Sequence, residues 1–438
     1  MGVSGRPLAV LPPLTPVAAG PAAGGGRGLS GRASQTGYAA VVVFYVIYFF
    51  RPEDYIPGLS LVPIEKLVGG LALLAFAGAV LGQRFQSSRE VILMALFLAD
   101  LCLCIPTAVW PGGSFALVVN SFAKCVLVVL ATICMADTPA RCRRVMAILT
   151  LAMLLMAAFA LGQPRELNRM YGIGQMFSDP NDFALNLCMI LPFVAVFALT
   201  ARSRLRRLFW LGGCGLAVLG VISTFSRGGF LALVATLLAL AWRFRGPVRR
   251  VVVTAVVAGV VAALTLSGSS YMNRLSTILH PATDKTDSAQ ERQALFMRSL
   301  VVTLEHPLLG VGPGNFEIVS GVWHTTHNTY TELSAEAGIP ALLLYLAIIG
   351  CGFRNVWAIT EGAEAEVLLL AGGVQCALIG YLVGAVFLST AYWLTPYLLV
   401  AFATILRRAA AAPAAAEEEE GAARGVAGVG GVFAGGLP

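Results

Sequence analysis

The chain has 438 residues, of which 58% are hydrophobic and only 12% charged, and its mean hydropathy is +0.80. Since soluble globular proteins carry about 25% charged residues, this composition excludes an ordinary cytosolic enzyme, a disordered protein and a nucleic-acid-binding domain, and no nucleic acid is expected as a partner. The formal net charge is +7, and its positions alternate with the hydrophobic runs, so it indicates membrane topology.

Apolar runs long enough to cross a bilayer, about 20 residues, recur along most of the chain. Backbone polar groups in lipid have to pair internally, so these runs are predicted to form helices. The predicted fold is an all-α polytopic membrane protein with about twelve transmembrane helices. The expected spans are 37–50, 66–82, 91–110, 115–136, 145–162, 181–200, 208–225, 228–242, 251–268, 329–352, 367–388 and 391–406.

The remaining segments are two tails and one long loop. Residues 1–36 are rich in Gly, Pro and Ala, and a flexible tail is preferred over a cleaved signal peptide because the next apolar run ends without a small-residue cleavage site. The expected order is this tail at 1–36, transmembrane helices 1–9 at 37–268, a large loop at 269–328, transmembrane helices 10–12 at 329–406 and a flexible tail at 407–438.

Basic residues are unevenly shared between the two sides of the expected membrane. Of the 30 Lys and Arg, 20 lie in the tails and every second loop, and nine lie in the alternate loops. The positive-inside rule then places both termini in the cytoplasm and loop 269–328 outside. In a bacterium this predicts a multi-pass protein of the inner membrane, in contact with membrane lipids, with a large periplasmic loop that contains helices. Transferase chemistry in the periplasm needs a donor that is already activated and carried across the membrane.

The first candidate site is the turn between two expected spans, which reads Thr224-Phe225-Ser226-Arg227-Gly228-Gly229. Its glycines permit a close backbone turn, and a guanidinium forms bidentate pairs with phosphate oxygens. Arg227 is therefore a candidate phosphate ligand. The alternative is an arginine that reaches to lipid headgroups, although a basic residue on the outer side runs against the topological trend.

The second candidate lies in the large loop, which holds all four histidines of the chain. Ser288 and Glu291 have the spacing of a capping box and predict a helix that runs to about Leu304. Arg292 falls in the first turn of this helix, where the helix dipole disfavours a positive charge. Its position indicates an anionic partner, which is either a neighbouring carboxylate or a substrate phosphate.

His324 and His327 precede the tenth span, and Glu332 and Glu336 follow on one helical face. Two histidines three apart could bind a metal, but a third ligand at a recognisable spacing is missing, so neither a metal nor another cofactor is expected. A histidine suits proton transfer near neutral pH. Carboxylates at the bilayer edge are costly unless they are used or paired, so Glu332 and Glu336 either bind substrate or form an interfacial polar collar.

The order of these motifs resembles the O-antigen ligase family, which includes lipopolysaccharide O-antigen ligases, O-antigen polymerases and protein O-glycosylation ligases. The resemblance is strongest over residues 170–350, and the family's usual layout has twelve helices. It rests on Ser226-Arg227-Gly228-Gly229, Arg292 in a large outer loop, Gly310-Val311-Gly312-Pro313-Gly314-Asn315-Phe316, His327-Asn328-Thr329-Tyr330 and Glu336-Ala337-Gly338. The segment Arg51-Pro52-Glu53-Asp54-Tyr55-Ile56-Pro57 is similar to the start of a branch of O-glycosylation ligases.

The resemblance implies a metal-independent, inverting glycosyltransferase. Such an enzyme moves a glycan from undecaprenyl diphosphate to an acceptor hydroxyl on the lipid A core, another glycan or a protein. By resemblance, Arg227 and Arg292 hold the diphosphate of the donor, and His327 contacts or deprotonates the acceptor. His324, Glu332 and Glu336 are further candidates for substrate binding, and the base is either His327 or a carboxylate such as Glu332. Two fixed guanidiniums could stabilise a diphosphate leaving group without a metal.

A secondary transporter of an anionic or lipid-linked sugar is the alternative, because twelve helices with polar residues on one side also suit that class. Transporters favour inverted repeats and binding residues near the membrane midplane. The inner parts of the expected spans are nearly free of charge apart from Asp100 and Lys124, and no repeat is visible. The concentration of polar motifs outside the spans favours the glycosyltransferase.

Overall fold

The structure is a computed structural model, and each element assigned in its described residues is a helix. The described residues are 29–51, 56, 58–59, 64–81, 88–163, 169–172, 179–246, 249–250, 253–254, 257–258, 261, 288–360 and 362–411. Most of the expected ninth span, most of both expected tails and residues 269–287 of the large loop lie outside these ranges, and so does His280.

The assigned helices cover most of the described chain. Their bounds are α1 (Leu29–Phe50), α2 (Ile64–Leu81), α3 (Arg89–Cys104), α4 (Pro111–Phe115), the π-helix η3 (Ala116–Phe122), α5 (Ala123–Met135), α6 (Pro139–Leu161), α7 (Pro180–Thr200), α8 (Arg204–Ser223), α9 (Arg227–Arg243), α11 (Ser288–Glu305), α12 (Phe316–Val319), α13 (Thr329–Glu336), α14 (Gly338–Trp357) and α15 (Ala365–Gly384). A further helix covers Leu394–Ala411. α4, η3 and α5 form one continuous rod, and α11 confirms the helix expected to start at Ser288.

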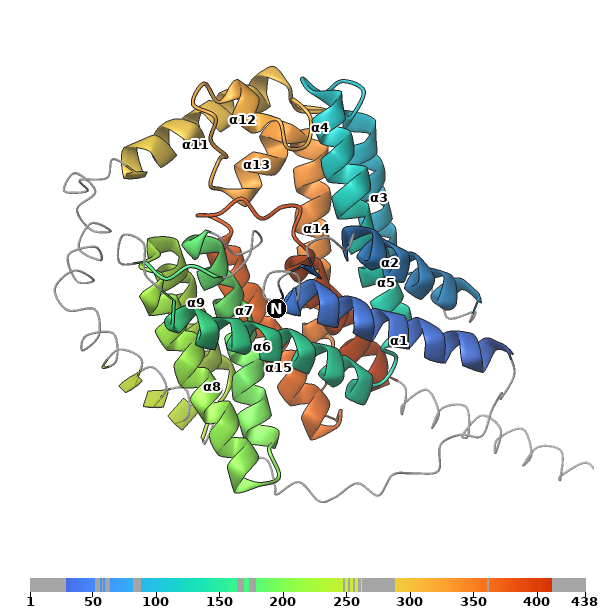
Figure 1. Ribbon diagram of the computed structural model, residues 1–438, viewed down its shortest axis with the longest axis vertical. Coiled ribbons are helices and arrows are strands. Elements are labelled where there is room, and N and C mark those ends of the chain that lie inside the picture. Colours follow the sequence, from blue (N-terminus) through green and yellow to red (C-terminus); the bar gives the residue numbers. More distant parts are fainter. Residues whose placement is uncertain are drawn as a thin grey trace, which may run out of the picture.

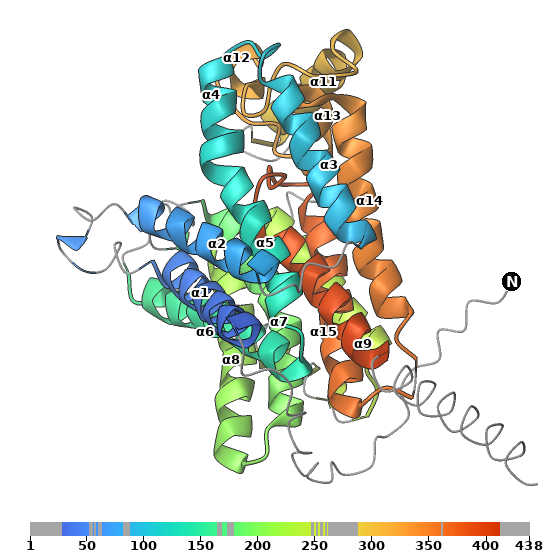
Figure 2. The ribbon, with the colours of Figure 1, turned by 90° about the vertical axis from the view of Figure 1, so that its right-hand side faces the viewer.

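The helices are arranged in three groups (Figure 1). α3, α4 and α14 stand together in the upper part with α11, α12 and α13 beside their upper ends, while α7, α8, α9 and α15 form a lower bundle. α1, α2 and α6 run across the long axis of the molecule, and α1 packs on both α2 and α6. Figure 2 shows from the side that α14 begins beside α13 and descends past α3. One end of α14 is therefore close to α11–α13, and its other end is far from them.

In the part of the chain that the structure describes, seven helices are long and apolar enough to cross a membrane. They are Pro111–Met135, Pro139–Leu161, Pro180–Thr200, Arg204–Ser223, Gly338–Trp357, Ala365–Gly384 and Leu394–Ala411. Gln35–Phe50 and Gly69–Leu81 are shorter apolar helices. These helices support the expected all-α polytopic membrane fold. The number of twelve spans, the periplasmic position of the large loop and the cytoplasmic termini remain predictions.

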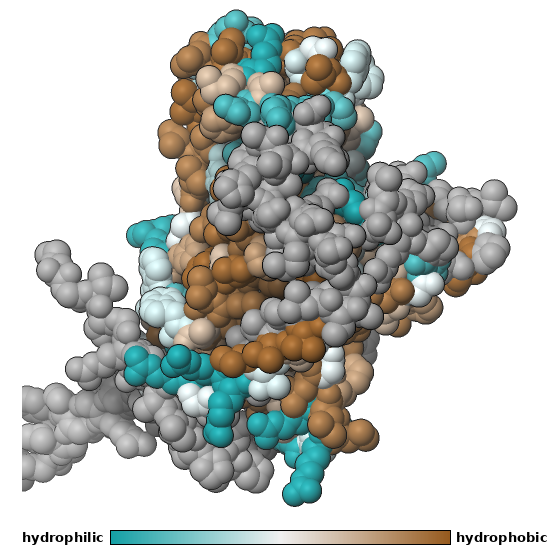
Figure 3. All heavy atoms as spheres, turned by 90° about the vertical axis from the view of Figure 1, so that its left-hand side faces the viewer, coloured by the Kyte–Doolittle hydropathy of each residue, from teal (hydrophilic) through white to brown (hydrophobic). Residues whose placement is uncertain are grey.

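Apolar side chains cover much of the helical surface. On the face drawn in Figure 3, hydrophobic residues extend along the upper part of the molecule. Hydrophilic residues gather at the top and at the lower edge of the molecule. Leucines are exposed on several different helices, and Leu81, Leu103, Leu205, Leu238 and Leu343 are examples. Extended apolar surface of this kind suits contact with lipid better than contact with water.

The stretch expected as a single tenth span, 329–352, is two helices. α13 ends at Glu336 and α14 begins at Gly338, whose φ of 82° lies in the left-handed region that favours glycine. The backbone amide of Ile339 donates to Pro307 O at 2.8 Å, so the break packs against the chain just beyond α11. α13 is thus a separate helix of 8 residues, and the span proper starts only at Gly338.

The break at Gly338 gives the first prediction. A Cβ at this position would lie 2.3 Å from Leu308 O, in a backbone conformation that alanine rarely adopts. We expect Gly338→Ala to lower the free energy of unfolding by about 1–3 kcal/mol, measured as a fall in melting temperature in detergent. Gly350→Ala, in the same helix but with open space around its Cβ, is the control and should be neutral or stabilising. Equal melting temperatures for the two variants would contradict the close packing at the break.

Candidate functional site

The first turn of α11 lies against the loop that carries His324 and His327. His324 Nε2 and Glu291 Oε1 are 3.4 Å apart, and both side chains are about half exposed. Arg292, the next residue of α11, is partly buried. Two motifs that are distant in the sequence therefore share one surface of the fold.

Local contacts fix the backbone around His327. Its φ of 51° is uncommon for a residue other than glycine. On one side, the hydroxyls of Thr326 and Ser389 are bonded at 3.1 Å. On the other side, Asn328 caps α13, because its Oδ1 accepts from the amide of Tyr330 at 3.0 Å. The His327 side chain is thus carried by an anchored turn.

His327 is partly buried close to charges of both signs. Burial and, after it, the positive charge of Arg292 lower the pKa of His327 from its ordinary value of 6.5, and His324 acts in the same direction. The carboxylates of Asp179 and Glu291 oppose this shift. The imidazole is therefore mainly neutral at pH 7, which is the form that accepts a proton.

Glu336 is buried in α13, and three donors surround its carboxylate. Oε2 accepts from Gly314 N at 2.8 Å and from the Tyr392 hydroxyl at 2.8 Å, and Oε1 accepts from Phe316 N at 3.1 Å. Burial raises the pKa of Glu336, and the three donors limit the rise because they favour the charged form. These contacts give Glu336 a structural task, since they hold the glycine-rich loop against α13. Its part in substrate binding remains a prediction.

The glycine-rich loop 310–316 is a tightly packed joint. Gly312 has a φ of 102°, and a Cβ there would lie 2.2 Å from the Cβ of Ala108. A Cβ at Gly310 would lie 2.2 Å from the backbone carbonyl carbon of Glu336. Close approach to the connection after α3 and to the end of α13 is therefore sufficient to explain these two glycines.

Glu332, one turn before Glu336, is also buried and faces the segment that follows α15. Its Oε2 accepts from Ala391 N at 3.4 Å. Burial and, after it, the nearby carboxylate of Glu336 raise the pKa of Glu332 well above its ordinary value. Glu332 is buried whereas His327 is only partly buried, so His327 is the more accessible candidate base.

Buried hydroxyl groups tie the start of α13 to the core. Thr329 Oγ1 donates to Leu388 O at 2.7 Å and is bonded to the Thr390 hydroxyl at 2.8 Å. Thr390 is bonded in turn to the Tyr381 hydroxyl at 2.9 Å, and Tyr381 is bonded to the Tyr345 hydroxyl. These contacts fix the turn before α13 relative to α14 and α15.

Arg227 occupies the first turn of α9. This turn packs against residues 385–390, which follow α15 and also contact the turn before α13. Ser226 caps this helix, and Arg227 is partly buried. A Cβ at Gly228 would lie 2.7 Å from the Cβ of Phe387, so glycine permits this close contact.

Arg169 is a further basic residue near this turn, and the motif-based interpretation did not single it out. Its Nε donates to Thr224 O at 3.0 Å, and its guanidinium also donates to Asn181 Oδ1 at 3.2 Å. Asn181 lies in the first turn of α7, which Asp179 caps. The argument that singled out Arg227, an arginine in an expected outer loop, applied equally to Arg169, but no motif surrounds Arg169.

The structure gathers polar groups of complementary chemistry at one end of the molecule. Within the described residues, no group of three or more His, Cys, Asp or Glu side chains could hold a metal ion. A guanidinium beside a neutral imidazole can bind an anion and accept a proton. The groups lying together are Glu291, Arg292, His324 and His327, with Glu332 and Glu336 buried in the adjacent helix α13 and Arg227 beyond residues 385–390.

Residues 212–346 match the family model described as O-antigen ligase. The matched segment contains Arg227, Arg292, His327 and the glycine-rich loop, so the match confirms the resemblance seen in these motifs. It covers less than half of the chain. No curated protein matches the chain.

The charge of Arg292 gives the second prediction. We expect Arg292→Gln to raise the pKa of His327 toward 6.5, because one of the causes that lower it is removed. Arg292→Lys keeps the charge and should leave this pKa nearly unchanged. The measurement is an NMR titration of imidazole-labelled protein, which has four histidines, with the His327 signal assigned from His327→Ala. An unchanged pKa in Arg292→Gln would mean that the two groups do not share a site.

Proposed function

We propose that this chain is a glycosyltransferase that moves a glycan from undecaprenyl diphosphate to an acceptor hydroxyl at the periplasmic face of the bacterial inner membrane. The observation that carries the proposal is that the first turn of α11, which holds Arg292, meets the loop of His327, because His324 Nε2 lies 3.4 Å from Glu291 Oε1. The O-antigen ligase match supports the same class of reaction, because its residues 212–346 include Arg292 and His327.

The proposed donor carries a diphosphate, which gains negative charge as the glycan leaves. Arg292 and Arg227 each lie in the first turn of a helix, α11 and α9. Amide groups and the helix dipole at such positions add positive potential to that of the guanidinium. In the proposed complex the two arginines bind the phosphate oxygens and stabilise the leaving group, so no metal is required.

His327 is the proposed general base, in preference to Glu332. The neutral imidazole can accept the proton of the acceptor hydroxyl, whereas Glu332 is buried and its carboxyl group already accepts from Ala391 N. Of the remaining candidates, His324 is about half exposed beside Glu291 and can contact substrate directly. Glu336, like Glu332, is buried, so we propose that both carboxyl groups act mainly by shaping the floor of the site.

The proposed reaction is a single displacement. The acceptor oxygen attacks the anomeric carbon from the face opposite to the diphosphate, so the anomeric configuration is inverted. The bond between the anomeric carbon and the phosphate oxygen breaks, and its electron pair stays with undecaprenyl diphosphate. The hydroxyl proton passes to His327, and the guanidiniums of Arg227 and Arg292 balance the charge of the released diphosphate.

The third prediction tests the reaction in cells. Deletion of the gene should change surface glycans in one of three ways, according to whether the acceptor is the lipid A core, another glycan or a protein. Loss of polymer from the lipid A core indicates a ligase, shortening of all chains a polymerase, and loss of protein-linked sugar an O-glycosylation enzyme. Unchanged glycans of all three kinds would contradict the proposal.

Complementation of the deletion strain then tests the assigned residues. We expect His327→Ala to lose about 10²–10⁴-fold in rate. Arg227→Lys and Arg292→Lys should each lose about 100-fold, because lysine lacks the planar fork. His306→Ala, at an exposed position beyond α11, is the control and should keep full activity. Full activity of both lysine variants at normal membrane levels would remove the arginines from the mechanism.

The fourth prediction concerns topology. Val322 lies exposed before His324, and Leu205 lies exposed in the first turn of α8. In a background without the exposed Cys102, Val322→Cys should react with an impermeant maleimide in intact spheroplasts. Leu205→Cys should react only after lysis, because the positive-inside rule places it in the cytoplasm. Labelling of Leu205→Cys before lysis would contradict the proposed topology.

A further inference from the structure

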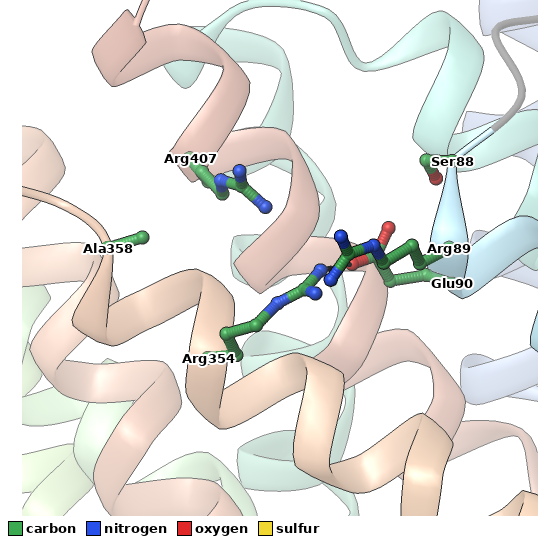
Figure 4. A pocket seen from close by; sticks show the side chains of 6 residues that line it. All are labelled: Ser88, Arg89, Glu90, Arg354, Ala358 and Arg407. Atoms are coloured by element: carbon green, nitrogen blue, oxygen red, sulfur yellow. Dashed lines mark hydrogen bonds and ion pairs between the residues drawn. The ribbon is translucent and has the colours of Figure 1, made fainter.

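A cavity of about 410 Å³ lies between α3, α14 and the helix Leu394–Ala411. Three arginines from these three helices contribute to its wall: Arg89, Arg354 and Arg407. Figure 4 shows the guanidiniums of Arg89 and Arg354 directed toward one another and that of Arg407 directed into the same space. Like charges repel at such positions, so this arrangement is costly unless anions balance it.

One carboxylate balances part of this charge. Glu90 is buried, and its Oε1 accepts from Arg354 at 3.2 Å and from Asn355 Nδ2 at 2.8 Å. Arg407 donates to Asn355 Oδ1 at 2.9 Å. The residues that line the cavity include one acidic side chain, Glu90, and three arginines. One negative charge does not balance three positive charges, so the wall keeps a net positive charge.

Donor capacity in the cavity wall also exceeds the acceptors present. Arg354 Nε is a buried atom without a hydrogen-bond partner. Arg89 makes no ion pair with any described carboxylate. Buried polar atoms without partners are uncommon and call for an explanation. An anion with several oxygen acceptors would satisfy these donors and the excess of positive charge together.

The cavity is separate from the candidate site at α13. Gly338 begins α14 beside α13, and Arg354 lies 16 residues later in the same helix. At a rise of 1.5 Å per residue, this separation corresponds to roughly 24 Å along the axis, which approaches the thickness of a bilayer core. If α14 spans the membrane, the two sites belong to opposite faces.

We propose that this cavity binds a phosphate group, either in the headgroup of an anionic phospholipid or as free inorganic phosphate. The planar guanidinium forks of three arginines match phosphate oxygens in geometry and in charge. Trp357, exposed one turn after Arg354, is of a residue type enriched where helices leave the hydrocarbon layer. The cavity therefore lies at a depth that both a headgroup and a soluble phosphate can reach.

The test uses the full chain in nanodiscs of phosphatidylcholine, with or without phosphatidylglycerol. Native mass spectrometry measures retained phosphatidylglycerol, and equilibrium dialysis measures bound inorganic phosphate. Arg89→Gln combined with Arg407→Gln removes two exposed guanidiniums and leaves the ion pair of Arg354 with the buried Glu90 intact. Arg204→Gln combined with Arg207→Gln removes the same charge from the exposed start of α8 and is the matched control.

We expect the cavity variant to bind its ligand more weakly by about tenfold for each arginine, since loss of a charge-assisted hydrogen bond has effects of this size. The control should change by less than about twofold. Retention of phosphatidylglycerol without phosphate binding identifies a lipid headgroup, and phosphate binding that displaces the lipid identifies free phosphate. Absence of both ligands from the unmodified protein, or equal losses in the two double variants, would overturn the proposal.

Discussion

The buried carboxylate of Glu336 is the contact on which the upper end of the molecule depends. It accepts from the glycine-rich loop at Gly314 and Phe316, and from Tyr392 in the chain after α15. Burying such a group without donors is costly, so α13 and its two partner segments are stabilised as a unit. Because the turn of His327 leads directly into α13, this carboxylate also helps to set the position of the candidate base.

The surroundings of α13 shift the pKa values of two titratable groups, His327 and Glu332, in opposite directions. Burial raises the pKa of Glu332, and burial with the charge of Arg292 lowers that of His327. The positive charge of Arg292 contributes to the shift at His327, and the nearby carboxylate of Glu336 contributes to the shift at Glu332. Environments that separate pKa values in this way are a frequent means of assigning different roles to neighbouring residues. Such a site suits an anionic ligand better than a cationic one.

Hydropathy and motif order predicted the helical membrane fold, the helix α11 and the resemblance that the family match confirms. They could not predict the break at Gly338, because the positive φ there goes with close packing against Leu308, which is 30 residues away in the sequence. The sequence analysis assigned Glu332 and Glu336 the same candidate role in substrate binding. The spacing of the two residues does not indicate how deeply each is buried or which hydrogen-bond donors surround its carboxyl group. The position of Arg169 at the α9 turn likewise depends on tertiary contacts that no local pattern encodes.

The start of the span at Gly338 has a consequence for how a lipid-linked substrate would arrive. α14 has 20 residues and begins immediately after α13, so the boundary between hydrocarbon and water would fall at the level of α13. A polyprenyl diphosphate keeps its tail in the hydrocarbon and its phosphates at that same boundary. Such a molecule could reach the Arg292 and His327 surface by lateral diffusion within one leaflet. Its encounter rate would then follow its surface density in the membrane and not its concentration in bulk water.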